Sequence, residues 1–223
     1  MRPAPAPVKC QTSDGIAIRG LRWTGGHDWL ILVHDRDGQS DLDSWRPLVP
    51  AFATSDWSIL AIDLRGHGAS EGEWTTSATG NDLMAAVTFA QFHGARWIAV
   101  LASGQSATAA LKSAADIALD ALVLLSPAPP DDAATDSLRG KGEAKFFAVG
   151  GNDETLQRAA SMLRNTSIGW AMLVTVPTGA QGTGLLTCEP ASQVTNRIVA
   201  FLTEQRFLAK SRGIPANPSI SPG

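Results

Sequence analysis

The chain has 223 residues, of which 44% are hydrophobic and 17% are charged, and its formal net charge is -3. This length and composition predict one globular domain with a sizeable core. Because Lys and Arg are not clustered, we expect no nucleic-acid partner. No uninterrupted apolar run reaches the roughly 18 residues that a membrane span requires, so we expect no membrane partner either.

The first residues and the cysteines indicate a cytoplasmic protein. Residues 1–7 contain three prolines and no apolar core, which is unlike a secretory signal. Cys10 and Cys188 are far apart in the sequence and match no zinc or redox motif. A disulfide between them stays open, but we favour two reduced thiols in a reducing compartment.

Strand and helix patterns alternate along the chain. Continuous apolar runs are typical of strands buried on both faces, and a Ser-Asp-Gly turn joins the first two expected strands. The expected strands cover residues 8–12, 15–22, 29–34, 58–63, 97–102, 121–125, 145–149 and 171–176. Apolar residues spaced three and four apart predict helices between most of them. The expected helices cover residues 42–54, 77–93, 105–116, 153–165 and 191–208, and only a loop or short helix fits between Ser126 and Lys145.

These elements predict an α/β fold with a mostly parallel, twisted sheet of about eight strands. Helices cover both of its faces, and an antiparallel hairpin begins it. We expect a flexible lead over residues 1–7, one domain over 8–208 and a Pro-rich tail over 209–223. We find no internal repeat.

Two motifs carry a resemblance to a known family. The first is Leu32-Val33-His34-Asp35, with Trp45 downstream. The second is Asp63-Leu64-Arg65-Gly66-His67-Gly68-Ala69-Ser70. Together they resemble the α/β-hydrolase superfamily, in particular its lidless or short-lid esterase, lipase and peptidase-like members. The resemblance implies the α/β-hydrolase fold with a minimal or absent cap domain. It also implies a Ser–Asp–His triad on the loops after the strands.

The segment that matches the nucleophile turn of this family has no serine at the expected position. Aligned without a gap, Ala102-Ser103-Gly104-Gln105-Ser106 places Gly104 in the nucleophile position. A shift of two residues offers Ser106 instead, with Thr108 where a glycine normally lets the helix pack closely. We favour Gly104, and we keep Ser106 as the fallback nucleophile. Serine in the first turn of a helix is also common for structural reasons.

The acid position of the triad is filled, but the base position is not. The run ending in Asn152-Asp153 resembles the turn that presents the catalytic acid, and Asp153 also suits the cap of a following helix. Asp131 and Asp132 are weaker alternatives. No histidine occurs after His93, and Gln181 stands where the catalytic histidine is expected. A glutamine amide cannot accept a proton near neutral pH, so it cannot serve as a general base.

The resemblance also implies an oxyanion hole made of the backbone N–H groups of Arg36 and Gln105. Asp35 would bring negative charge to this loop, which is unfavourable for acyl transfer. We name Arg36, Gln105 and Gln181 as candidate binding residues. An ion pair of Arg36 with Asp35 or Asp37 is the simpler interpretation of that arginine. His34 and His67 are interpreted as structural, and neither His27 nor His93 is well placed to replace the missing base.

These residues lead to two hypotheses. The first is a catalytically inactive hydrolase-fold protein that binds a small molecule or a protein partner. The alternative is a weak or unconventional serine ester hydrolase that uses Ser106, with Asp153 and with water or Gln181 at the base position. No metal-ligand cluster and no Gly-rich phosphate loop is present, so we expect no cofactor and no metal. A homo-oligomer formed through residues 205–209 or the tail stays open.

Overall fold

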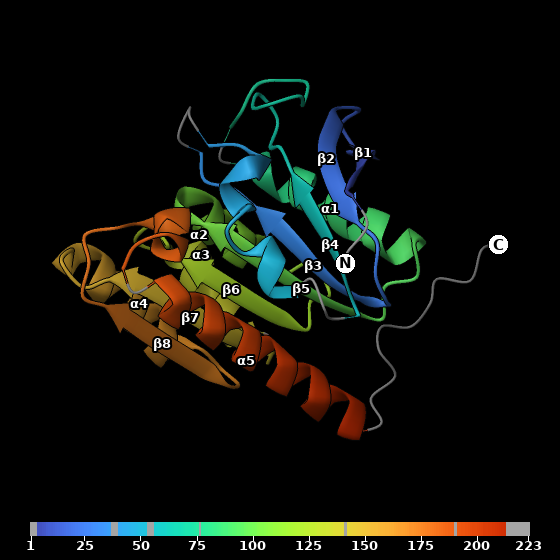
Figure 1. Ribbon diagram of the computed structural model, residues 1–223. Helices are drawn as coiled ribbons and strands as arrows, with labels where there is room; N and C mark the ends of the chain where they lie inside the picture. Colours follow the sequence, from blue (N-terminus) through green and yellow to red (C-terminus); the bar gives the residue numbers. More distant parts are fainter. Residues whose placement is uncertain are drawn as a thin grey trace.

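Eight strands form one sheet in the computed structural model, in the order β1-β2-β4-β3-β5-β6-β7-β8 (Figure 1). The structure describes residues 4–36, 40–52, 56–75, 77–140, 142–189 and 191–212. The strands are β1 (Ala6–Gln11), β2 (Ala17–Trp23), β3 (Asp28–Val33), β4 (Trp57–Ile62), β5 (Trp97–Ser103), β6 (Ala121–Leu125), β7 (Ala144–Gly150) and β8 (Ala171–Val176). β1 and β2 pair antiparallel, β2 pairs antiparallel with β4, and all other pairs are parallel. The predicted hairpin and parallel sheet are therefore confirmed.

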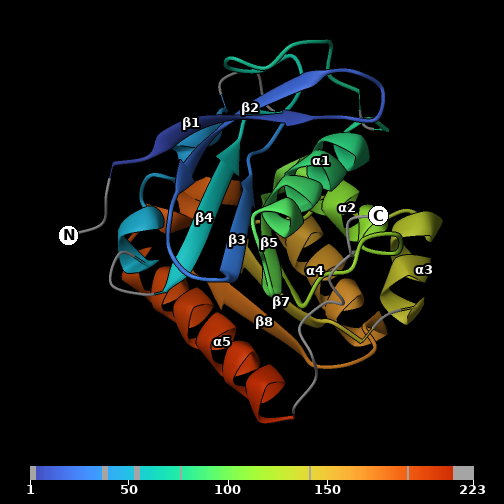
Figure 2. The same cartoon turned by 90° about the vertical axis from the view of Figure 1, so that its right-hand side faces the viewer.

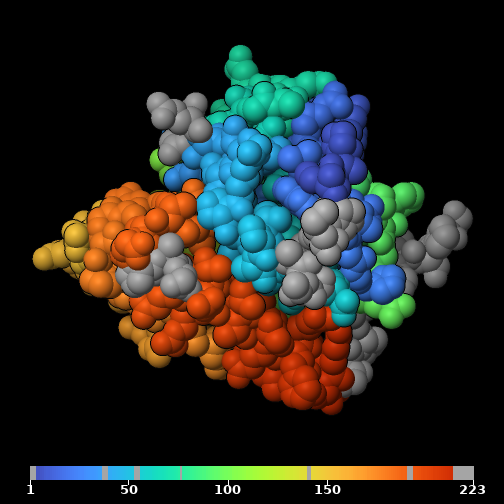
Figure 3. Space-filling view, in the orientation of Figure 1, coloured from blue at the N-terminus to red at the C-terminus, as the bar shows by residue number. Residues whose placement is uncertain are grey.

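Helices cover both faces of the sheet, as Figure 2 shows. The helices are α1 (Thr79–Phe92), α2 (Gly104–Ser113), α3 (Asp132–Gly140), α4 (Glu154–Thr166) and α5 (Ala191–Ser211), and short 3-10 turns form η1 (Leu42–Trp45), η2 (Val49–Phe52) and η3 (Gly182–Leu186). α1 to α4 pack on one face of the sheet, and α5 packs on the other face together with η1 and η2. Figure 3 shows the surface of this second side, where the segment of η1 and η2 lies next to α5. Only α3 lies between β6 and β7, so no cap domain is present in the described part of the chain.

Each face of the sheet has its own apolar core, because successive strand residues point to opposite sides. In β3, Ile31 and Val33 pack toward the side of α1 and α2. Leu30 and Leu32 pack toward η1, η2 and α5. Trp45 is fully buried in this second core. Burial on both faces explains why these strands are continuous apolar runs in the sequence.

The helix predicted over residues 42–54 is wrong. The segment forms the 3-10 turns η1 and η2 instead. Pro47 and Pro50 lie within it, and proline has no backbone N–H to donate to a helical hydrogen bond. Trp45, Leu48 and Phe52 are still buried, and Leu42 and Val49 are partly buried. The pattern therefore predicted the inward-facing residues correctly and the element incorrectly.

The outer limits of the folded region differ slightly from the predicted domain limits. β1 begins at Ala6, inside the expected lead, and α5 continues to Ser211, inside the expected tail. Residues 1–3 and 213–223 lie outside the described residues. None of the described helices combines the length and the hydropathy needed to cross a membrane. Both cysteines are free thiols, and burial raises the pKa of Cys10 to about 12.

The loop after β4, residues 63–70, is held by a charge network in which Arg65 and Asp82 are buried and Asp14 is exposed. The Arg65 guanidinium donates to Asp82 on α1 and to Asp14 in the β1–β2 turn, at 2.8 and 2.7 Å. The side chain of Asp82 is fully buried and that of Arg65 is 7% exposed. Arg65 holds the pKa of Asp14 well below its usual range. This network ties the antiparallel hairpin to the parallel part of the sheet.

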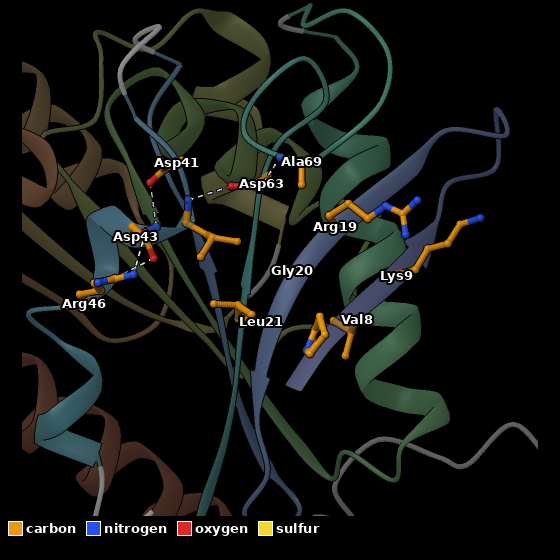
Figure 4. Close-up of a pocket in the computed structure, with 12 residues that line it drawn as sticks. Val8, Lys9, Arg19, Gly20, Leu21, Asp41, Asp43, Arg46, Asp63 and Ala69 are labelled. Carbon is orange, nitrogen blue, oxygen red and sulfur yellow. Dashed lines mark hydrogen bonds and ion pairs between the residues drawn. The ribbon is translucent and has the colours of Figure 1, made fainter. Parts of the chain in front are cut away.

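A cavity of about 620 Å³ lies between the β1–β2 hairpin and η1. Figure 4 shows its charged walls, with Asp41 and Asp43 on the η1 side and Lys9 and Arg19 on the hairpin. Gly104, the predicted nucleophile position, does not line this cavity. The cavity is therefore separate from the site predicted by the sequence.

Candidate functional site

The turn from β5 into α2 places Gly104 at its apex. Ser103 is the last residue of β5 and is extended, with φ -125° and ψ 141°. Gly104 is the first residue of α2 and has φ +58°, in the left-handed region that favours glycine. This is the strained strand–turn–helix geometry that exposes a nucleophile in the resembled family. Gly104 has no side chain to present there.

Ser106, the fallback nucleophile, lies inside the first turn of α2. Its side chain is fully buried, with an exposed fraction of 0%. Its hydroxyl has no hydrogen-bond partner among the residues that the structure describes. Within the described part of the chain, no imidazole and no carboxylate is therefore hydrogen-bonded to Ser106.

The two backbone N–H groups of the predicted oxyanion hole both donate to one side chain, Asp35. The amide of Arg36, after β3, donates to Oδ1 of Asp35 at 2.7 Å. The amide of Gln105, in the first turn of α2, donates to the same oxygen at 2.9 Å. A methyl group built on Gly104 would lie 1.7 Å from Oδ2 of Asp35. The Asp35 carboxylate therefore lies directly above Gly104, where a nucleophile side chain would project.

Arg36 and Gln105 also interact through their side chains at the rim of this turn. The Arg36 guanidinium donates to Oε1 of Gln105 at 3.3 Å and lies over the ring of Trp74, 4.4 Å from its centroid. Of the two predicted ion-pair partners of Arg36, Asp35 forms no pair with it in the structure, where the Arg36 guanidinium bonds Gln105 instead. Asp37 lies outside the described residues. Arg36 is instead oriented by a cation–π contact, which leaves its charge at the surface.

Asp153 and Gln181, the predicted acid and base positions, contact each other directly. The Gln181 side chain donates from Nε2 to Oδ2 of Asp153 at 3.0 Å. Oδ1 of Asp153 accepts the amides of Thr155 and Leu156, both at 3.0 Å, and so caps α4. Asp153 therefore performs the capping role and holds Gln181 at the same time. The pair has the geometry of an acid–base dyad, but its amide cannot take up a proton.

The Gln181 loop lies beside the turn at Gly104. A methyl group built on Gly182 would lie 2.5 Å from the hydroxyl of Ser103, the residue before Gly104. The Gly182 amide donates to Oγ of Ser126 at 2.9 Å. Ser126 follows β6 and has φ +48°, which is unusual for a residue other than glycine. These contacts bring the loops after β5, β6 and β8 together at the carboxyl edge of the sheet.

His34 and His67 contact backbone groups of the loops around them. His34 is fully buried, and its Nε2 accepts the amide of Leu64 at 3.0 Å. Burial lowers the pKa of His34, which keeps its ring neutral. His67 faces the carbonyl oxygens of Arg65 and Arg36, at 3.1 and 3.0 Å. Both rings hold loops together, as the sequence predicts.

No metal centre is formed by the residues that the structure describes, since no three His, Cys, Asp or Glu side chains gather in a suitable cluster. Several polar groups of the site pair with one another, whereas the buried hydroxyls of Ser103 and Ser106 have no partner among the described residues. The two amides bind Asp35, Asp153 binds Gln181 and the helix amides, and Gly182 binds Ser126. The arrangement leaves the side chains of Arg36, Gln105 and Gln181 exposed, where they can contact a ligand.

Three contributors to the site were missed by sequence reasoning. Asp35 was recognised as a misplaced charge but not as the acceptor of both amides, although its position after His34, where the resembled family has glycine, is a usable signal. Ser126 was interpreted only as the end of a strand. Trp74 carries no sequence signal for its contact with Arg36, because that contact depends on how a long loop folds back.

Comparison with known proteins shows the fold. No protein-family model matches the sequence, and no curated protein matches it either. The esterase Pf2001 of Pyrococcus furiosus is 16% identical with a TM-score of 0.76, over 90% of this chain and 92% of that one. DcsB, in a complex with its substrate analogue, is 13% identical with a TM-score of 0.78, over 91% and 99%. The dienelactone hydrolase from Anabaena variabilis is 15% identical with a TM-score of 0.76, over 92% and 99%. These similarities confirm the predicted α/β-hydrolase fold.

Proposed function

Because the chain has the α/β-hydrolase fold, we propose that it is a hydrolase-like protein that binds a ligand without Ser–His–Asp catalysis. The ligand is a small molecule or a segment of a partner protein, held at the loops after β3, β5 and β8. Two free thiols support our proposal of a cytoplasmic location. We propose no cofactor for this binding.

One observation carries the proposal. Gly104 lies at the apex of the turn. The Asp35 carboxylate fills the space next to it that the side chain of a nucleophile would need. Acyl transfer requires a nucleophile, a general base and open donors for the oxyanion. The nucleophile position is a glycine, the base position is Gln181, and both donors are taken by Asp35. Loss of one triad member alone leaves only about 10³–10⁴-fold acceleration over water.

The alternative, a weak ester hydrolase with Ser106 as nucleophile, needs a different arrangement of α2. The Ser106 hydroxyl would have to reach the surface, and it is fully buried. It would also need a base within about 3 Å. Asp153 is already engaged by Gln181 and by the helix amides.

The test uses two reagents on the purified protein. We expect no covalent labelling by a fluorophosphonate probe and no turnover of p-nitrophenyl acetate or butyrate above the rate in buffer without protein. Asp116→Ala changes an exposed residue outside the site loops, and we expect the same result for it. Labelling that maps to Ser106 by mass spectrometry, and that Ser106→Ala abolishes, would overturn the proposal in favour of the alternative.

A further inference from the structure

Asp35 occupies two positions of the site with one carboxylate. Its Oδ1 accepts the amides of Arg36 and Gln105, at 2.7 and 2.9 Å. These amides belong to residues 69 positions apart in the sequence, so they meet only in the folded chain. Its carboxyl carbon lies 2.1 Å from a methyl group built on Gly104, so the same group fills the space above the turn.

A side chain bound in this way competes strongly with any ligand for the two amides. A charge-assisted hydrogen bond is about twice as strong as a neutral one. Because Asp35 belongs to the chain, its carboxylate is present at a high effective concentration, on the order of millimolar or more. A dissolved carboxylate or an ester carbonyl must displace it, and an anion must also approach its negative charge.

We infer that Asp35 is the specificity-determining residue of this site and that it excludes carboxylates and ester carbonyls from the amides of Arg36 and Gln105. The inference rests on the proposed function because it treats the site as a binding site. It adds the chemistry that the site rejects, and the residue responsible. Without the Asp35 side chain, the same two amides accept a carboxylate from solution.

The positive charge of Arg36 also favours binding of a carboxylate from solution once the Asp35 side chain is removed. The Arg36 guanidinium is held at the rim by Trp74 and Gln105. Asp35 and Arg36 together carry no net charge, and removal of Asp35 leaves one positive charge next to two unpaired amides. Both changes favour an incoming carboxylate.

Acetate is a suitable probe, because it matches the Asp35 carboxylate and is not hydrolysed. We would follow the backbone amide signals of Arg36 and Gln105 by ¹H–¹⁵N NMR during titration with sodium acetate, against sodium chloride at equal concentration. The proteins are the wild type, Asp35→Ala and the surface control Asp116→Ala. We expect saturable shifts of both signals in Asp35→Ala, with a dissociation constant at least ten-fold lower than in the wild type and the control.

Two results would overturn the inference. One is equal acetate binding by the wild type and by Asp35→Ala, and the other is no saturable shift in a folded Asp35→Ala. If Asp35→Ala did not give a dispersed spectrum, Asp35→Ser would replace it, since a serine side chain is too short to bridge both amides. Fluorophosphonate labelling of the wild type would contradict the proposed function but not this result, so the two failures are distinguishable.

Discussion

The loop after β4 and the candidate site both join polar groups at the carboxyl edge of the sheet, but they do so at different depths. In the first, Arg65 is buried between Asp82 and Asp14. In the second, Asp35 and Asp153 are half-buried and Gln181 is exposed. In each region several polar groups pair with one another, so such pairing alone does not distinguish a structural network from a binding site.

Because the two regions differ in burial, substitutions in them are expected to change the free energy of unfolding by different amounts. Removal of one partner from a buried ion pair leaves a charge in a medium that solvates it poorly. Removal of a half-exposed partner lets water take its place. We therefore expect the loop after β4 to determine stability, and the site to tolerate substitution at a small cost, with Gly104 as an exception.

The largest effect is expected for Arg65→Met. It leaves the Asp82 carboxylate buried without its cation, and we expect a loss of about 3–5 kcal/mol in the free energy of unfolding. Arg46→Met is the matched control, because Arg46 makes a similar pair with Asp43 at 2.8 Å but is largely exposed. We expect it to cost less than about 1 kcal/mol. Guanidinium unfolding measures both, and equal losses would contradict the comparison.

The next largest effect is expected for Gly104→Ala, which introduces a side chain into the space of Asp35. Left-handed backbone costs about 1–2 kcal/mol for a residue other than glycine, and the displaced Asp35 adds to this. We expect a total loss of about 2–3 kcal/mol in unfolding free energy.

Two variants separate these contributions. Gly15→Ala is the control for backbone strain alone, because Gly15 has φ +84° and open space around an added methyl group. The cost of Gly104→Ala in an Asp35→Ala background is expected to fall to that of Gly15→Ala. A cost that stays unchanged in the double variant would show that Asp35 does not fill this space.

The centre of the sheet was predictable because β3 to β7 are mostly apolar and are buried on both faces. β6 and β8 match their predicted ranges, and the remaining strands differ by a few residues at their ends. The helix predicted over residues 42–54 was wrong because the prediction relied on the spacing of apolar residues. Pro47 and Pro50 prevent a regular helix in this segment.

The positions of the site were also predictable, but their occupancy was not. Chain spacing placed Asp153 and Gln181 in neighbouring loops, and the structure gives them a direct hydrogen bond. The position of the Asp35 carboxylate depends on its side-chain conformation and on two backbone amides from distant segments. No local pattern encodes such an arrangement, because each part alone is compatible with other conformations.

The smallest effects are expected in the Asp153–Gln181 pair, and they reveal what Asp153 does. Asp153→Ala removes the cap of α4, and we expect a loss of about 1 kcal/mol in unfolding free energy. Gln181→Ala removes one exposed hydrogen bond and is expected to change it by less than about 0.5 kcal/mol. Asp153→Asn is the control, because asparagine caps a helix about as well as aspartate. Urea unfolding compares the three. A cost of Gln181→Ala equal to that of Asp153→Ala would show that the pair itself stabilises the fold, in the manner of the buried network around Arg65, and would remove the distinction between the two regions.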